Sequence, residues 1–324
     1  MDTSTSRPAA ADELLITRLL HAARALVWQA WTEPNYLKRW WGPHGFDIPQ
    51  CDMELRVGGT YRVVTRSADG ADYPITGEFR EVKPIEQLVM TMDCTEHPPA
   101  WHELVRANRA PGDDNPAGVM TLTATFDNLG EATQLSIRTR FESSAIRDAM
   151  LKMGMLDGWS QSLERLDTLV VHESGAADRH ILVNRLIDAP RERVFAAWTD
   201  PAQVVQWWGP RGFSTTSTSM DVREGGVWRF TLQGPDATIY RHKLVYDAVL
   251  APERLVYEHC DDVPDGPIHF RSTVSFAEHG DKTYLSLFLL FPTAARRDQM
   301  ARDMSAIKEG NQSLDLLQDY LARA

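Results

Sequence analysis

The sequence has few cysteines, an excess of negative over positive charge, and no long apolar run. Its 3 cysteines among 324 residues are scattered without CxxC spacing, which excludes a disulfide framework. With 34 Lys and Arg against 45 Asp and Glu, the net charge is −11, so neither nucleic acid nor an anionic membrane is an expected partner. The N-terminal stretch Met1–Ala11 lacks a hydrophobic signal core. We therefore expect a cytoplasmic protein.

Sequence motifs for the common catalytic chemistries are also lacking. The chain contains no phosphate-binding loop, dinucleotide fingerprint or nucleophile elbow, and no Ser, His and Asp spacing selects a triad. His97 and His102, with Glu96 and Glu103 beside them, do not have the spacing of a standard metal site. We therefore predict no catalytic residue, no metal ligand and no cofactor.

What the sequence does contain is an internal repeat. Shifting the chain by 167 residues places Leu14–Phe46 on Ile181–Phe213 without a gap, and 16 of these 33 positions are identical. Both segments end in the motif W-W-G-P-x-G-F, and the period is far too long for a solenoid. We predict two domains in series, 13–172 and 178–324, with a short polar linker between them.

Both copies indicate the same order of elements. An apolar strand opens each copy, two short helices follow, and the second helix starts at Pro34 or Pro201. A strand meander comes next, and a long helix closes the copy. We predict an α+β fold with two tandem domains, each a curved antiparallel sheet of about six or seven strands wrapped on the long C-terminal helix. The apolar stripes of these helices are Leu156, Trp159, Leu163, Leu166 and Val170, and Met300, Met304, Ile307, Leu314, Leu317 and Leu321.

This order, with W-W-G-P after the second short helix and a Gln-Ser-Leu segment in the closing helix, resembles the START-like (SRPBCC) superfamily. Within it, the sequence is most similar to the branch related to the C-terminal domain of the heat-shock-protein-90 ATPase activator. The resemblance implies that each copy is a helix-grip domain, with a cavity between the sheet and the closing helix. It also implies that the tryptophan motif stabilises the fold. Two departures stand out: Gly310 replaces Trp159 in the second copy, and the first copy has an insertion at Glu96–Gly118, which we expect to form a solvated loop.

Strand alternation selects the residues that face such a cavity, because side chains two apart share a face. In the second copy this face carries several aromatic rings and the pair His242 and His259, whose equivalents in the first copy are Ile75 and Met92. Two neutral imidazoles there could orient a ligand or accept a proton. Ordinary hydrogen-bonded or exposed histidines are the alternative. The predicted ligand-binding residues are Trp41, Tyr61, Val63, Met92 and Trp159, then Trp208, Trp228, Phe230, His242, Tyr246 and His259.

Three functions fit these observations. The first is binding or carriage of a small hydrophobic molecule, which the apolar face and the lack of catalytic motifs favour. The second, implied by the resemblance to the wider superfamily, is a cyclase-, aromatase- or hydrolase-like enzyme that acts on a polyketide-like substrate, with the histidine pair as acid and base. The third, implied by the resemblance, is a chaperone-linked interaction module. We expect a binder rather than an enzyme, and the sequence leaves a protein partner or a homodimer open.

Overall fold

The computed structural model describes residues 9–108, 119–263, 266–303 and 306–323, with side chains omitted for 303–310. The chain divides into two compact units, the first ending at Ser174 and the second beginning at Gly175. Each unit has its own hydrophobic core. We describe the two separately.

The first unit is built on a seven-stranded antiparallel sheet in the order β1-β7-β6-β5-β4-β3-β2. Buried and solvent-facing residues alternate along its central strands, as expected when one face is covered. The last strand, β7, pairs with the first strand, β1, so β1 and β2 form the two edges of the sheet. The strands are β1 (Glu13–Leu20), β2 (Asp47–Met53), β3 (Thr60–Arg66), β4 (Asp72–Lys83), β5 (Gln87–Met92), β6 (Met120–Leu129) and β7 (Ala132–Arg140).

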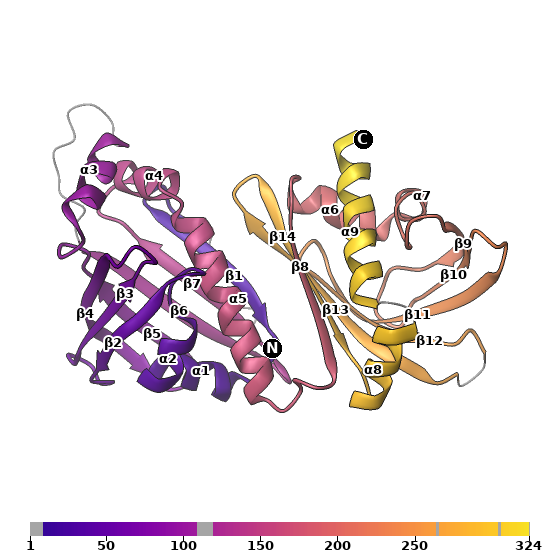
Figure 1. Ribbon diagram of the computed structural model, residues 1–324, viewed down its shortest axis with the longest axis horizontal. Coiled ribbons are helices and arrows are strands. Elements are labelled where there is room, and N and C mark those ends of the chain that lie inside the picture. Colours follow the sequence, from indigo (N-terminus) through magenta and orange to yellow (C-terminus); the bar gives the residue numbers. More distant parts are fainter. Residues whose placement is uncertain (1–8, 109–118, 264–265, 304–305, 324) are drawn as a thin grey trace. The chain divides into compact units, whose positions relative to one another are not determined.

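The helices of the first unit lie on one face of this sheet or at its end (Figure 1). Pro34 begins the second short helix at a position that needs no backbone N–H. Ser143 caps the fourth by accepting a hydrogen bond from the Ile146 amide, and Gly154, at φ +86°, separates it from the closing helix. The helices are α1 (Arg24–Thr32), α2 (Pro34–Trp40), α3 (Pro99–Ala107), α4 (Ser144–Lys152) and α5 (Met155–Glu173).

The second unit repeats this topology with sheet order β8-β14-β13-β12-β11-β10-β9. The predicted α+β helix-grip fold is therefore confirmed in both copies. The strands are β8 (His180–Ile187), β9 (Ser214–Met220), β10 (Val227–Gln233), β11 (Ile239–Leu250), β12 (Arg254–Cys260), β13 (Ile268–His279) and β14 (Lys282–Leu290). The helices are α6 (Arg191–Thr199), α7 (Pro201–Val204), α8 (Ala294–Asp303) and α9 (Ala306–Arg323).

Three sequence-based expectations need correction or fall outside the structure. The insertion in the first copy is not simply a solvated loop, because Pro98 and Pro99 begin α3, which buries Val105. The stripe of the second copy is divided between α8 and α9, and its Met304 lies outside the described residues. Alternation along the sequence predicts that Tyr240 shares the inward face of His242, but Tyr240 is 46% exposed.

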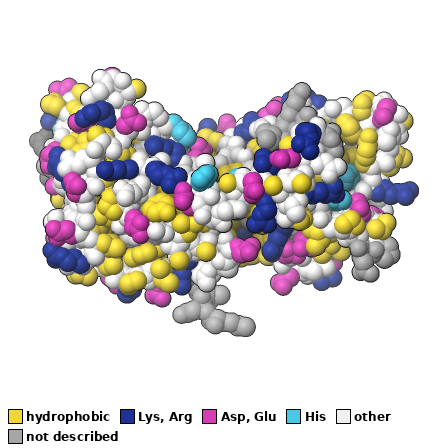
Figure 2. Space-filling model, turned by 60° about the horizontal axis from the view of Figure 1, so that its bottom comes forward, with side chains coloured by type: hydrophobic (Ala, Val, Ile, Leu, Met, Phe, Trp, Pro, Cys, Tyr) yellow, Lys and Arg dark blue, Asp and Glu magenta, His cyan; other side chains and the backbone are white. Residues whose placement is uncertain are grey.

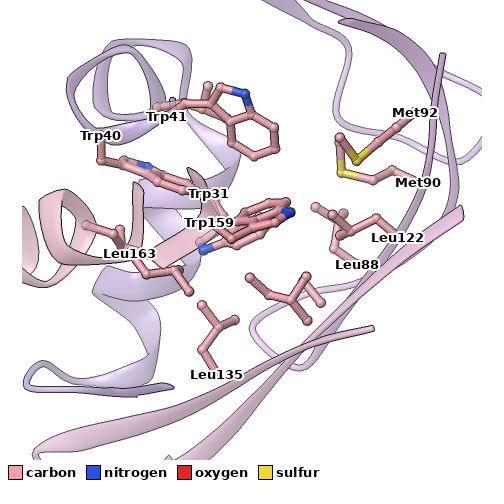
Figure 3. Packing of buried hydrophobic residues seen from close by; sticks show 14 of the residues in the cluster. Trp31, Trp40, Trp41, Leu88, Met90, Met92, Leu122, Leu135, Trp159 and Leu163 are labelled. Atoms are coloured by element: carbon pink, nitrogen blue, oxygen red, sulfur yellow. The ribbon is translucent and has the colours of Figure 1, made fainter. Parts of the chain in front are cut away.

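Tryptophans fill the junction of the two short helices, the closing helix and the sheet in the first unit. Figure 3 shows the rings of Trp31 and Trp159 lying face to face, with 6.3 Å between centroids and 11° between planes. Trp41 meets Trp159 edge-on at 5.3 Å. Met90 and Met92 come from the sheet side and point toward these rings (Figure 3). The stripe of α5 is confirmed, since four of its five residues form the helix side of this core: Trp159, Leu163, Leu166 and Val170.

Charges of both signs are distributed over the surface. Figure 2 shows Lys and Arg side chains interspersed with Asp and Glu on the face it presents. Many of them form ion pairs, such as the one between Arg66 and Asp72. No helix in the described part of the chain is long and apolar enough to cross a membrane.

A close backbone approach in the first unit gives a test of its packing. The Tyr61 hydroxyl donates to the Thr91 carbonyl at 2.6 Å, and a Cβ on Gly77 would lie 2.6 Å from the Tyr61 ring and 2.0 Å from that carbonyl oxygen. We predict that Gly77→Ala lowers the free energy of unfolding by about 2 kcal/mol through overpacking. Gly158→Ala in α5, where nothing lies within 4 Å, is the control. It should raise stability by roughly 0.5–1 kcal/mol. Urea unfolding of both variants measures this, and equal stabilities would contradict it.

Candidate functional site

The five candidate residues of the first unit all lie inside its core. Tyr61, Val63 and Met92 come from the sheet, Trp41 follows α2, and Trp159 belongs to α5. Each is buried, none more than 7% exposed. Burial raises the pKa of the Tyr61 hydroxyl well above its ordinary value, so this group stays protonated. The structure thus brings these five together in one filled interior.

Five of the six candidates of the second unit lie on a continuous band of aromatic rings that crosses the inner face of its sheet. Trp208 contacts Trp228 at 4.9 Å, and Trp228 stacks on Phe230 at 4.2 Å. Phe230 in turn stacks on His242 at 5.0 Å. Strand pairing explains the order, because Phe230 of β10 lies directly opposite His242 of β11. Tyr246, on the same face of β11, is buried below the band.

The band continues through two histidines that sequence alternation placed on one face. His242 Nδ1 and His259 Nε2 are 3.1 Å apart, within hydrogen-bonding distance. His259 then stacks on Phe270 of β13 at 4.8 Å with 7° between planes. The two other ring nitrogens, His242 Nε2 and His259 Nδ1, are buried and have no hydrogen-bond partner among the described residues. Buried polar atoms are usually hydrogen-bonded to protein, water or a ligand, so these two nitrogens are candidate contacts for a bound molecule.

Both histidines are held in the neutral form. Burial lowers the pKa of His259 to about 3, with further lowering from His242 and His269. Burial likewise lowers the pKa of His242, again with a contribution from His269. Neutral imidazoles each carry one N–H and one lone pair, so the pair is uncharged near pH 7.

The sequence did not predict a charged network that lies beside the pair. Arg296 of α8 donates to His269 Nδ1 at 2.8 Å, so the N–H of this imidazole is on Nε2, which donates to Asp261 at 2.8 Å. This hydrogen bond lowers the pKa of Asp261. The ring of His269 lies 5.7 Å from that of His259. A bulge between His259 and Cys260 brings His269 there, and simple alternation does not reveal a bulge.

The two units differ most where the closing helix meets the rings. Trp198 and Trp208 repeat the edge-on contact of Trp31 and Trp41, with 5.7 Å and 6.0 Å between the centroids. In the first unit Trp159 adds a third ring, whereas the equivalent position of α9 is Gly310. The second unit therefore lacks one indole at the position where the first is filled.

Accessibility also separates the two units. In the second unit Trp228, Phe230 and Tyr246 are buried, whereas Trp208, His242 and His259 are only partly buried. All five candidates of the first unit are buried. Solvent thus reaches part of the ring band in the second unit.

Two surface hollows lie elsewhere, beside the edge strands of the two sheets. One, of about 850 Å³, is bordered by Met53, Arg62 and Glu78 in the first unit. The other, of about 480 Å³, lies along β9 next to Pro201. Neither is lined by a closing helix. Within the described residues, no group of three or more His, Cys, Asp or Glu side chains is arranged to hold a metal ion.

Comparison with known proteins gives one family match in each half of the chain. The family model for Activator of Hsp90 ATPase homolog 1-like proteins matches residues 21–171 and again 188–322. A solved structure from Nitrosomonas europaea is 26% identical, covers 52% of this chain and 99% of its own, and has a TM-score of 0.43. An AHSA1 protein from Silicibacter pomeroyi is 21% identical, with 50% and 99% covered and a TM-score of 0.39.

One similar structure spans both units. The di-domain ARO/CYC protein BexL from the BE-7585A biosynthetic pathway covers 95% of this chain and 98% of its own, at 15% identity and a TM-score of 0.35. The comparison with curated proteins gives no match.

The fold and the repeated match define the class of protein: two START-like helix-grip domains in series. The chain belongs to the family of Activator of Hsp90 ATPase homolog 1-like proteins, with one family domain in each half.

The histidine pair makes the second unit sensitive to acid. Unfolded histidine takes up a proton near pH 6.5, whereas folded His259 does so only near pH 3, so protons favour the unfolded state between these values. The free energy of unfolding is therefore highest above pH 6.5, and it decreases as the pH falls below that value. For His259 alone we expect a loss of about 2 kcal/mol between pH 7 and pH 5.

The double variant His242→Ile, His259→Met, which installs the residues of the first unit, removes this contribution. Urea unfolding at pH 7 and pH 5 should show that the variant loses less stability than the native chain, by at least about 2 kcal/mol. An identical pH dependence in the two proteins would refute the neutral, buried pair.

Proposed function

We propose that the second unit binds a small hydrophobic molecule between the ring band of its sheet and α9. The observation that carries this proposal is the partly buried pair His242 and His259, which lies between Phe230 and Phe270. Two nitrogens of this pair have no hydrogen-bond partner among the described residues. Apolar walls with a few convergent polar groups are the usual lining of small-molecule sites.

The difference between Trp159 and Gly310 in the closing helices also supports a binding site in the second unit. Trp159 packs against Trp31 and Trp41 and completes the interior of the first unit. Gly310 provides no side chain at the equivalent position, so a planar ligand can take the place of that indole. We infer that the first unit is the structural copy and the second the binding copy.

The surroundings of this site favour a binder over an enzyme. The pair is held neutral, and Asp261, whose charge acts on both histidines, is hydrogen-bonded to His269. The three cysteines are buried free thiols, which fits our proposal of a reducing, cytoplasmic location.

Filling the proposed site tests this function. Naphthalene, an apolar bicyclic ring of indole size, should bind the full chain in isothermal titration calorimetry. We expect Gly310→Trp to reduce its affinity about tenfold or more, because the new indole takes the ligand's place; tenfold corresponds to about 1.4 kcal/mol. Asp319→Trp is the matched control, since it adds the same ring to the same helix at a side chain that is 57% exposed.

Circular dichroism first establishes that both variants are folded. Unchanged naphthalene affinity in Gly310→Trp, equal loss in both variants, or no binding by the native chain would each contradict the proposed function.

A further inference from the structure

The stacking of the histidine pair restricts how a ligand can approach it. Phe230 covers one face of His242, at 5.0 Å and 19° between planes, and Phe270 covers one face of His259, at 4.8 Å and 7°. The two imidazoles adjoin each other on the remaining side, with 5.1 Å between centroids. A polar group therefore meets the edges of these rings, where the nitrogens lie.

The hydrogen bond between the two rings fixes what the free nitrogens offer. It uses the N–H of one neutral imidazole and the lone pair of the other. The two remaining nitrogens, His242 Nε2 and His259 Nδ1, must then present one N–H and one lone pair between them. Moving both protons within the pair exchanges these roles, so His242 Nε2 can serve as donor or as acceptor.

Of these two atoms, His242 Nε2 is the better placed for a ligand. It is the ring atom farthest from the backbone, and His242 shares the inner face of β11 with Leu244 and Tyr246, which are both core residues. His259 Nδ1 lies closer to its own strand. Among the described residues, the charged groups beside the pair, Asp261 and Arg296, are already joined to each other through His269.

We propose that the ligand of the second unit is a hydroxylated aromatic molecule whose hydroxyl group hydrogen-bonds to His242 Nε2. This rests on the proposed function and specifies its ligand class. A hydroxyl both donates and accepts, so it satisfies either proton arrangement of the pair. The aromatic ring of this ligand would pack against Phe230, which contacts both His242 and Trp208.

Two probes with the same ring system test this inference. A purely apolar site prefers naphthalene over 2-naphthol, because the hydroxyl loses its hydrogen bonds to water on binding. A site with a buried nitrogen that lacks a hydrogen-bond partner reverses that preference. In calorimetry with the full chain, we expect 2-naphthol to bind about fivefold or more tightly than naphthalene.

His242→Phe keeps an aromatic ring and removes both nitrogens, so this variant should prefer naphthalene. His44→Phe makes the same change in the first unit, at a side chain that is 58% exposed, and should keep the native preference for 2-naphthol. Nitrogen NMR of histidine-labelled native chain gives a readout without any variant. There, 2-naphthol should shift the Nε2 resonance of His242, and naphthalene should shift it far less.

The outcomes separate the two proposals. Naphthalene binding without a preference for 2-naphthol, or a preference that survives in His242→Phe, overturns the hydroxyl anchor and leaves the proposed function standing. An Nε2 resonance that does not respond to bound 2-naphthol also overturns it. Failure of both probes to bind the native chain overturns both proposals.

Discussion

Each unit depends on one buried indole that ties its two short helices together. Trp40 donates from Nε1 to the carbonyl of Ala30 at 2.8 Å, and Trp207 does the same to Ala197 at 2.9 Å. A buried indole N–H needs such a partner. The bond joins Trp40 at the end of α2, or Trp207 just after α7, to the last turn of the preceding helix. The next residue in each unit, Trp41 or Trp208, packs edge-on against this indole and faces the interior. The other residues of each interior pack around these two short helices and the hydrogen bond that joins them.

On this common frame, a few positions give the two interiors different chemistry. The first unit places Trp159, Ile75 and Met92 where the second has Gly310, His242 and His259. The first set is apolar and fills its core. The second has no side chain at the position of Trp159 and carries two neutral imidazoles, each with one buried nitrogen that has no hydrogen-bond partner among the described residues. A duplicated domain can diverge in this way because the fold is maintained by residues that both copies keep, which leaves the interior of one copy free to change.

The repeat and strand alternation predicted much of this arrangement. Alternation requires only that neighbouring strands be paired in the expected register, so it placed His242 and His259 on one face. It could not predict that the bulge after His259 brings His269 beside the pair, because a bulge changes the facing of the residues that follow. Helix α3 was missed because a Pro-Pro sequence can begin either a loop or a helix. The contact from Arg296 joins distant segments and has no local signal.

Xenon binding in crystals of the full chain would test the central claim most directly, because xenon enters apolar cavities of roughly ligand size without altering the chain. The account predicts a xenon site in the second unit, beside Phe230 and His242 and below Gly310, and none beside Trp159 in the first unit. A second unit whose interior admits no xenon because side chains fill it, or a xenon site found only in the first unit, would contradict the account.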